Sequence, residues 1–280
     1  MKKADDLNYT VSELCEAFDV PPSSYYYKHM KPSKQDSAMT QDIKIIFKHS
    51  GHTYGKRRIK AELNGLGYQV GLHKTKRLMK ESGIVALTPR KRHYYPDCGF
   101  AHQYVPNILN RDFSPEKMNT HWAGDITYVR TYQGWSYLAA VIDLKTKEIV
   151  GYAVSTSPNA ALVRRALIHA IKTKQPDTTK LLFHSDQGTQ YAAQSFQYCL
   201  RVHGIKQSMS RRGNCWDNAV MERFFRSLKT ERLHHVSLVS HLVASTCIEQ
   251  YIYFYNYQRR HSTIGYITPH QMATKLKNVA

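Results

Sequence analysis

The chain has 280 residues, with 40 Lys and Arg against 21 Asp and Glu, and a formal net charge of +19 at pH 7. A protein of this charge attracts polyanions, so we expect nucleic acid as the partner, ahead of an anionic membrane. The sequence contains no run of 18 apolar residues and no apolar leader, so neither a membrane span nor a signal peptide is expected. The five cysteines are scattered without a C-x-x-C pair, which favours reduced thiols in the cytoplasm over a disulfide framework or a zinc site.

The first predicted unit is a small helix-turn-helix-like segment over residues 1–36. Apolar residues recur at helical spacing from Val11 to Phe18, and Pro21-Pro22 break the pattern. A second short helix is expected to begin at Ser23 or Ser24. Residues 31–40 are polar and contain a proline, and we interpret them as a linker.

A stronger helical pattern follows over residues 41–95, which we predict to be a basic helix-turn-helix DNA-binding domain. Its last helix carries four cations on one side, which predicts contacts along DNA phosphates. These four residues are Lys74, Lys76, Arg77 and Lys80. The alternative is a basic helix face that only meets solvent. Residues 96–114 read as a linker, and Arg90, Lys91 and Arg92 just before it are also expected to touch DNA.

From residue 120 the pattern changes to strands. Three apolar runs with turns between them predict a meander, and the order then becomes helix, strand, helix, strand, long helix. This order is typical of the ribonuclease-H-like fold, a mixed five-stranded α/β sheet with helices on both faces. We therefore predict a catalytic domain over residues 115–275 that ends in a helical tail.

Three carboxylates stand out in this domain. Asp125 lies in the first strand, Asp186 ends the fourth strand, and Glu222 lies on the long helix. If the two strands are neighbours, both aspartates converge at one edge of the sheet and Glu222 completes the set from the helix. Three oxygen-only ligands suit Mg²⁺, and two such ions about 3.5–4 Å apart would serve an in-line phosphoryl displacement.

The same three residues carry a family resemblance. Asp125, Asp186 and Glu222, with 35 residues between the last two, match the D,D(35)E pattern of transposases related to retroviral integrases. The surrounding words narrow the match, and they are "WAGDITYV", "FHSDQGTQY", "SMSRRGNCWDNAVMERFFRSLKTE" and "YIYFYNYQRRHSTIGYITPHQ". The chain resembles the second-reading-frame transposase of bacterial insertion-sequence family three. Its segment "HTYGKRRIKAELNGLGYQVGLHKTKRLMKESGI" is similar to the helix-turn-helix segment of that family.

The resemblance implies DNA cleavage and strand transfer at the terminal inverted repeats of an insertion sequence. It also implies two Mg²⁺ ions per active site, with Mn²⁺ as a substitute, held by the three carboxylates. The implied partners are double-stranded DNA of the element ends and the target, and further copies of the chain in a homo-oligomer on DNA. A product of an upstream reading frame, fused or separate, is another implied partner, and the implied location is the bacterial nucleoid in the cytoplasm.

Two other functions stay open at this point. One is a non-catalytic DNA-binding regulator of transposition, although a chain released from catalysis would have no need of all three carboxylates. The other is a structure-specific nuclease of the same fold. The helical DNA-binding segments argue against a nuclease, because an enzyme that reads DNA shape needs less apparatus for reading sequence.

Several residues near the carboxylates have two readings. Asn218 lies one turn before Glu222 and either orients it, touches DNA, or only begins the helix. Lys229 resembles a DNA contact of integrases, whereas Arg226 is as well explained by a solvated face. Arg211 and Arg212 lie in a loop with Asn214 that either closes on DNA or is plain surface.

Two more residues of the sheet and three of the tail are candidates. We expect His184 to have a structural partner and Asp143 to be a turn residue rather than a ligand. In the tail, Arg259 and Arg260, with the following histidine, are expected to reach DNA.

Overall fold

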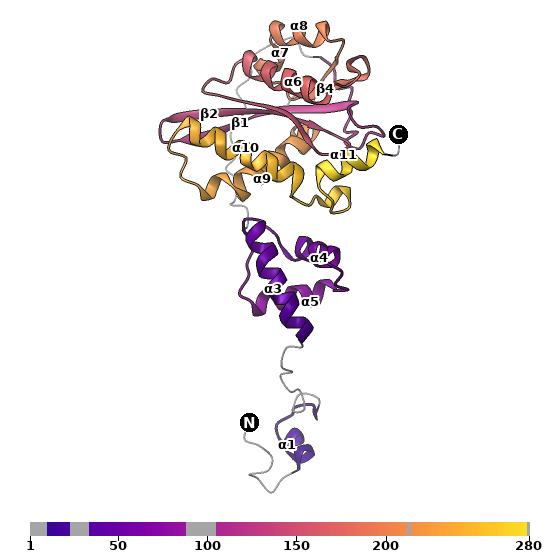
Figure 1. The fold of residues 1–280 in the computed structure, drawn as a ribbon, viewed down its shortest axis with the longest axis vertical. Coiled ribbons are helices and arrows are strands. Elements are labelled where there is room, and N and C mark those ends of the chain that lie inside the picture. The colour runs from indigo at the N-terminus through magenta and orange to yellow at the C-terminus, as the bar shows by residue number, and fades with distance from the viewer. Residues whose placement is uncertain (1–9, 23–33, 88–104, 212–213, 279–280) are drawn as a thin grey trace.

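The computed structural model describes residues 10–22, 34–87, 105–211 and 214–278 (Figure 1). The first helix, α1 (Val11–Ala17), begins with a capping box in which Thr10 and Glu13 satisfy each other's backbone N–H groups. This confirms the first predicted helix. The expected helix start at Ser23 or Ser24 lies outside the described residues, as do Arg90, Lys91, Arg92 and Arg212.

A three-helix domain follows, formed by α3 (Lys34–His49), α4 (Lys56–Gly65) and α5 (Leu72–Glu81). Its core consists of buried apolar residues from all three helices, among them Met39, Ile43, Ile59, Leu63 and Leu78. The predicted linker over residues 31–40 was wrong from Lys34 onward. Met39 is only 2% exposed and packs in this core, so burial of its side chain extends the helix through a polar stretch.

The catalytic domain contains one mixed sheet, as predicted. Its strands are β1 (His121–Thr131), β2 (Gly134–Asp143), β3 (Ile149–Ser155), β4 (Leu182–Ser185) and β5 (Lys206–Met209). They are ordered β3-β2-β1-β4-β5 across the sheet. The first three strands are antiparallel, and β4 pairs in parallel with both β1 and β5. The central strand β1 therefore joins the antiparallel and parallel halves.

Helices cover both faces of the sheet (Figure 1). One face packs against α6 (Ala160–Lys174), α7 (Thr189–Ala192) and α8 (Gln194–Val202). The other face packs against α9 (Ala219–Glu231) and α10 (His241–Tyr257). The short turns are η2 (Thr178–Lys180), η3 (Cys215–Asn218), η4 (Leu233–His235) and η5 (Ser262–Ile264), and α11 (Pro269–Lys277) ends the described chain. No helix of the described segments is long and apolar enough to cross a membrane.

The tail after α10 fastens the three-helix domain to the catalytic domain. Arg260 donates from Nη2 to Glu62 Oε2 at 2.8 Å, and its backbone N–H donates to the Tyr54 hydroxyl at 2.8 Å. The neighbouring Arg259 is 4% exposed and donates to both carboxylate oxygens of Glu231. Carboxylates thus hold both tail arginines, and their contact with DNA stays a prediction.

Candidate active site

The parallel pairing of β1 with β4 brings two aspartates to one edge of the sheet. Gly124 lies opposite Ser185 in this register, so the residues that follow them, Asp125 and Asp186, lie side by side at the carboxyl end of β4. The Phe183 ring packs directly against Gly124, where an added Cβ would lie 2.5 Å from the ring. The two strands thus meet as the sequence predicted.

The alternation of β1 decides which way Asp125 points. Ala123 and Val129 pack on the α9 face of the sheet, and Asp125 shares their parity, so it faces α9 as well. Glu222 lies in the first turn of that helix. The described geometry therefore brings the third carboxylate to the same side of the sheet as Asp125.

Electrostatics show that these carboxylates interact. Burial raises the pKa of Asp125 well above its usual range, and the negative charges of Asp186 and Glu222 raise it further. The Ile126 N–H, which donates to Asp125 Oδ1 at 2.7 Å, and the positive charge of Lys229 lower the same pKa. The excess of negative charge at this edge is thus only partly offset by the chain itself.

Asp186 is fixed by the loop that follows it. Its Oδ1 accepts from the Gly188 N–H at 3.0 Å, and burial raises the pKa of the carboxyl. A Cβ at Gly188 would come within 3.0 Å of that same oxygen, so a side chain there would crowd the carboxylate. The glycine in "HSDQGTQY" therefore keeps the loop close to Asp186.

The donor chemistry fits a hard divalent cation. Asp125, Asp186 and Glu222 offer only oxygen atoms, and a cation would relieve the repulsion that raises the pKa of Asp125. Among the residues that the structure describes, no three His, Cys, Asp or Glu side chains are arranged to hold a metal ion as they stand. The three carboxylates are near enough to interact through their charges but do not yet form a closed ligand shell.

Asn218 connects the start of α9 to β1. Its Nδ2 donates to the Gly124 carbonyl oxygen at 3.4 Å, and the side chain is only 6% exposed. Its Oδ1 is buried without a hydrogen-bond partner. Asn218 occupies the N-cap position of α9, but its side chain makes no capping bond, so the capping interpretation is only partly right.

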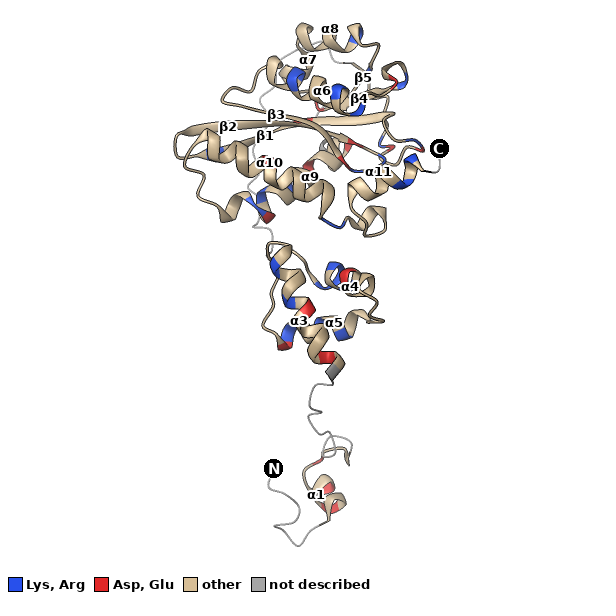
Figure 2. Ribbon diagram, viewed as in Figure 1, with Lys and Arg blue, Asp and Glu red and all other residues tan. Residues whose placement is uncertain are grey.

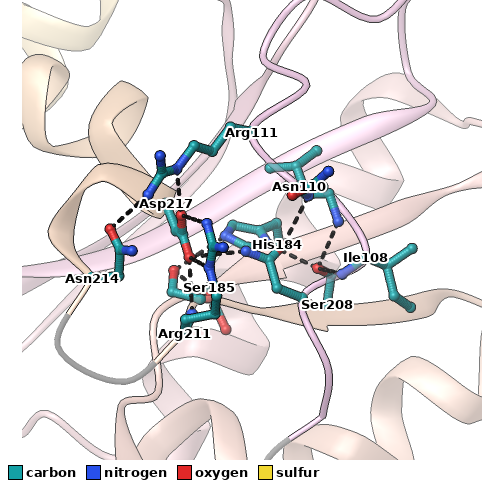
Figure 3. Close-up of polar contacts among 12 residues, drawn as sticks. Ile108, Asn110, Arg111, His184, Ser185, Ser208, Arg211, Asn214 and Asp217 are labelled. Atoms are coloured by element: carbon teal, nitrogen blue, oxygen red, sulfur yellow. Dashed lines mark hydrogen bonds and ion pairs between the residues drawn. The ribbon is translucent and has the colours of Figure 1, made fainter.

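The loop before α9 is latched by a buried carboxylate (Figure 3). Asp217 is fully buried and accepts from Arg211 at 3.0 Å (Nε) and 2.9 Å (Nη2), and from Arg111 Nε at 2.7 Å. These bonds hold the pKa of Asp217 well below its usual range, with the Arg211 side chain as the largest cause. Arg111 also donates to Asn214 at 3.0 Å. Asp217 therefore holds Arg211 in place, and contact of this half-exposed side chain with DNA stays a prediction.

His184 has the structural partners that were expected (Figure 3). Its ring lies between Ser208 Oγ at 2.9 Å and Ser210 Oγ at 3.2 Å, and burial lowers its pKa to about 4. Ser208 Oγ already accepts from two backbone N–H groups, so its proton goes to the ring and the imidazole proton lies on Nε2. A neutral histidine here joins β4 to β5.

The expected turn role of Asp143 is confirmed. Its carboxylate accepts from the backbone N–H groups of Lys145 and Thr146 and, through Oδ2, from Asn119 at 2.7 Å. One carboxylate oxygen thus serves the chain reversal between β2 and β3, and the other ties this turn to the segment before β1, which explains a buried aspartate outside the active site.

The predicted DNA-contact helix α5 divides into two pairs of cations. Lys74 lies 2.6 Å from one oxygen of Asp36 and Arg77 lies 3.0 Å from the other, so this pair ties α5 to α3. Lys76 and Lys80 are exposed. Their contact with DNA phosphates stays a prediction. The DNA contacts of the exposed Arg226 and of Lys229 also stay predictions.

The sequence matches models of known protein families and the sequences of known proteins. Models described as "Integrase core domain" match residues 115–215 and 203–269, and a model described as "HTH-like domain" matches residues 34–92. A 31 kDa protein of insertion element IS600 from Shigella sonnei is 38% identical, over 93% of this chain and 100% of that protein. The transposase InsF for insertion sequence IS3A from Escherichia coli is 33% identical, over 95% of each chain.

Two solved structures align with the chain at lower identity. A simian T-cell lymphotropic virus intasome in complex with a PP2A regulatory subunit aligns at a TM-score of 0.48 and 16% identity, over 78% of this chain and 70% of that one. The HTLV-2 integrase catalytic core domain in complex with magnesium aligns at 0.44 and 16%, over 55% of this chain and 96% of that one. By the identity and coverage of the curated relatives, the chain belongs to the IS3 family of insertion-sequence transposases.

Proposed function

We propose that this transposase cuts and joins DNA at the terminal inverted repeats of its insertion sequence by Mg²⁺-dependent phosphoryl transfer. The observation that carries the proposal is the meeting of Asp125 and Asp186 at one sheet edge, with the charge of Glu222 acting on the same carboxyl. A structural ion-pair network would place cations among such carboxylates, whereas here burial and like charges dominate.

Asp125, Asp186 and Glu222 would hold the metal, two ions per site, with Mn²⁺ as a substitute. When bound, Mg²⁺ supplies positive charge that draws electrons from the phosphate oxygens and so makes the phosphorus electrophilic. The chain itself holds Asp125 through Ile126 N–H and Asp186 through Gly188 N–H, so two carboxylates are set before any metal arrives. Such preset donors lower the cost of reorganisation during the reaction.

The proposed reaction has two steps, strand cleavage and strand transfer. In the first, a water oxygen attacks the phosphorus at the element end, the P–O3′ bond breaks, and the strand leaves with a 3′-OH. In the second, that 3′-OH attacks a phosphodiester of target DNA, a new P–O3′ bond forms, and the target strand is released at its own 3′ oxygen. Lys229, whose charge reaches Asp125, and the exposed Arg226 would hold phosphates beside the carboxylates.

DNA recognition falls to the three-helix domain and its surroundings. The exposed Lys76 and Lys80 of α5 would contact phosphates of the terminal repeat. We further propose that the active form is a homo-oligomer on DNA, fused to or assisted by a product of an upstream reading frame.

The test is Mg²⁺-dependent nicking of a labelled duplex that carries the terminal repeat. Wild type should cut, and Asp186→Asn should bind equally well but lose cutting by about 10³-fold or more, since it removes an interaction made in the transition state. Asp177→Asn is the matched control, because Asp177 is an exposed turn aspartate paired with Lys180. If Asp186→Asn cuts like wild type, the carboxylate assignment is wrong. If wild type binds but does not cut, a regulator of transposition is the better reading.

A further inference from the structure

We propose that a basic groove between the three-helix domain and the back of α9 binds the phosphate backbone of the duplex that connects the recognised repeat to the cut site. This inference rests on the proposed function and adds a second DNA-binding surface to it. The groove is a cavity of about 940 Å³. Its walls come from the three-helix domain (Arg58), from α9 (Arg223), and from the C-terminal tail (Lys275).

The charge of the groove is strongly one-sided. Seven of the described residues that line it are Lys or Arg, whereas Glu231 is the one acidic side chain among them. That carboxylate is already engaged, because Arg259 lies 2.6 Å from it and Arg58 lies 3.5 Å from it. The surplus cations therefore have to be balanced from outside this wall, and a polyanion does so most effectively.

The cations converge on one buried point. Burial and then the positive charges of Arg259, Lys147, Arg58 and Arg223 lower the pKa of His261 to about 3. Four cations from four segments of the chain thus act on the same imidazole, which stays neutral. The Lys147 ammonium lies nearby and donates to the carbonyl oxygens of Phe113 and Leu144 at 2.7 and 2.6 Å, and the negative charge of Asp143 also stabilises it.

The position of α9 links the groove to the carboxylates. Ala219, Arg223 and Thr230 line the groove and lie on one side of the helix, while Glu222 and Lys229 lie on another. Arg226 lies between the two sides and lines the groove as well. A backbone bound in the groove would therefore be separated from the carboxylate edge by about the diameter of one helix, roughly 10 Å.

Geometry favours DNA over a small anion. The groove is lined from Thr53 and Leu87 in the three-helix domain to Ser262 and Lys275 in the tail, and cations outside the group around His261, such as Arg226 and Lys145, also line it. A small anion would contact two or three of these cations and leave the others unbalanced. A duplex that is read by the three-helix domain and cut beside α9 has to pass between the two, where the groove lies.

The experiment measures DNA binding without catalysis. The terminal-repeat duplex is titrated with protein in EDTA, by fluorescence anisotropy, at several KCl concentrations. The groove variant is Arg223→Gln/Lys275→Gln, in which both side chains are exposed. The control variant, Arg201→Gln/Lys172→Gln, removes the same two charges from exposed positions on α8 and α6, across the sheet.

The groove variant should lower the slope of log K against log salt by about 1.8, because each lost phosphate contact contributes about 0.9. The control variant should keep the wild-type slope. The proposal is overturned if the groove variant keeps the wild-type slope, or if both variants lose the same amount, since bulk charge would then explain the binding. Lys145→Gln, which changes a third groove cation on a different loop, should lower the slope by about 0.9 and guards against a local defect of α9.

Failure of this inference differs from failure of the proposed function. A wild type that cuts, together with a groove variant of normal slope, rejects the groove alone. A wild type that binds without cutting, together with a groove variant of reduced slope, keeps the groove as a DNA site and rejects the catalytic assignment.

Discussion

At the scale of single residues, His184 and Asp217 lie close in sequence to the candidate metal ligands but stabilise the fold. His184 is 1% exposed and neutral, and burial lowers its pKa to about 4, below the ordinary value of 6.5. Between pH 4 and pH 6.5, His184 therefore binds a proton in the unfolded chain but not in the folded chain. The stability that this histidine contributes is complete above about pH 6.5 and declines as the pH falls towards 4.

The lowered pKa of His184 predicts how stability depends on pH. The free energy of unfolding of wild type, measured by urea titration, should decrease between pH 7 and pH 5, and His184→Gln should lose part of that dependence, since glutamine does not titrate. His261 has a lowered pKa for the same reason, so His261→Gln should flatten a further part of the curve. An unchanged pH dependence in the His184→Gln variant would show that its ring is not neutral in the folded state.

Asp217 gives a prediction of the same sign in a lower pH range. Its pKa is lowered by Arg211 and Arg111, so its stabilisation is present above about pH 4 and is lost as the pH falls below that value. Asp217→Asn should destabilise the protein by about 2 kcal/mol at pH 7, because the carboxylate is buried but its arginines are half exposed. The difference from wild type should shrink below pH 4. A cost that is the same at pH 3.5 and pH 7 would contradict the latch.

At the scale of elements, the sequence predicts best where burial follows a simple period. The alternation of apolar residues and amphipathic spacing predicted the five strands and α6. The order of the strands predicted that Asp125 and Asp186 lie close together. The start of α3 was missed because residues 34–40 are polar and only tertiary packing of Met39 extends the helix.

Two arginines have distant partners that the sequence did not reveal. Arg260 pairs with Glu62, 198 residues away, and Arg211 belongs to a latch that includes Arg111. In a chain of net charge +19, any cation looks like a DNA contact until its distant carboxylate is known. Such long-range pairs leave no local pattern in the sequence.

The division of α5 yields an element-scale prediction. Lys76→Gln/Lys80→Gln should weaken binding of the terminal-repeat duplex by about tenfold at 150 mM salt and leave the unfolding free energy unchanged, because both side chains are exposed. Lys74→Gln should instead lower stability by about 1 kcal/mol, since it removes a cation that pairs with Asp36. Anisotropy and urea unfolding of the same two proteins separate the roles. Equal effects of both variants on binding would contradict the division.

At the scale of the whole molecule, charged and polar contacts join the two domains, together with Phe254 of α10, which packs against the three-helix core. Lys and Arg are found in both domains (Figure 2). Arg260, Glu62 and Tyr54 form the clamp between the domains, with Arg58 and Glu231 beside it. Interfaces of this kind fix an orientation but are weak enough to move. The clamp is therefore expected to set the distance between the repeat that is read and the bond that is cut.

Loosening this clamp should uncouple the two activities. Glu62→Gln removes the partner of Arg260 while both domains keep their cores, so the affinity for the terminal-repeat duplex should stay within about threefold of wild type, whereas nicking should fall by about tenfold or more. The reason is that a misplaced scissile phosphate loses rate without losing the contacts that bind the repeat. Glu81→Gln is the matched control, because Glu81 is an exposed acid on α5 paired only loosely with Arg77 at 3.8 Å. Sequencing-gel mapping of the nick should also show a spread of cut positions in the Glu62→Gln variant alone. If that variant cuts at one position and at the wild-type rate, the orientation of the domains must be set by the DNA and not by the clamp.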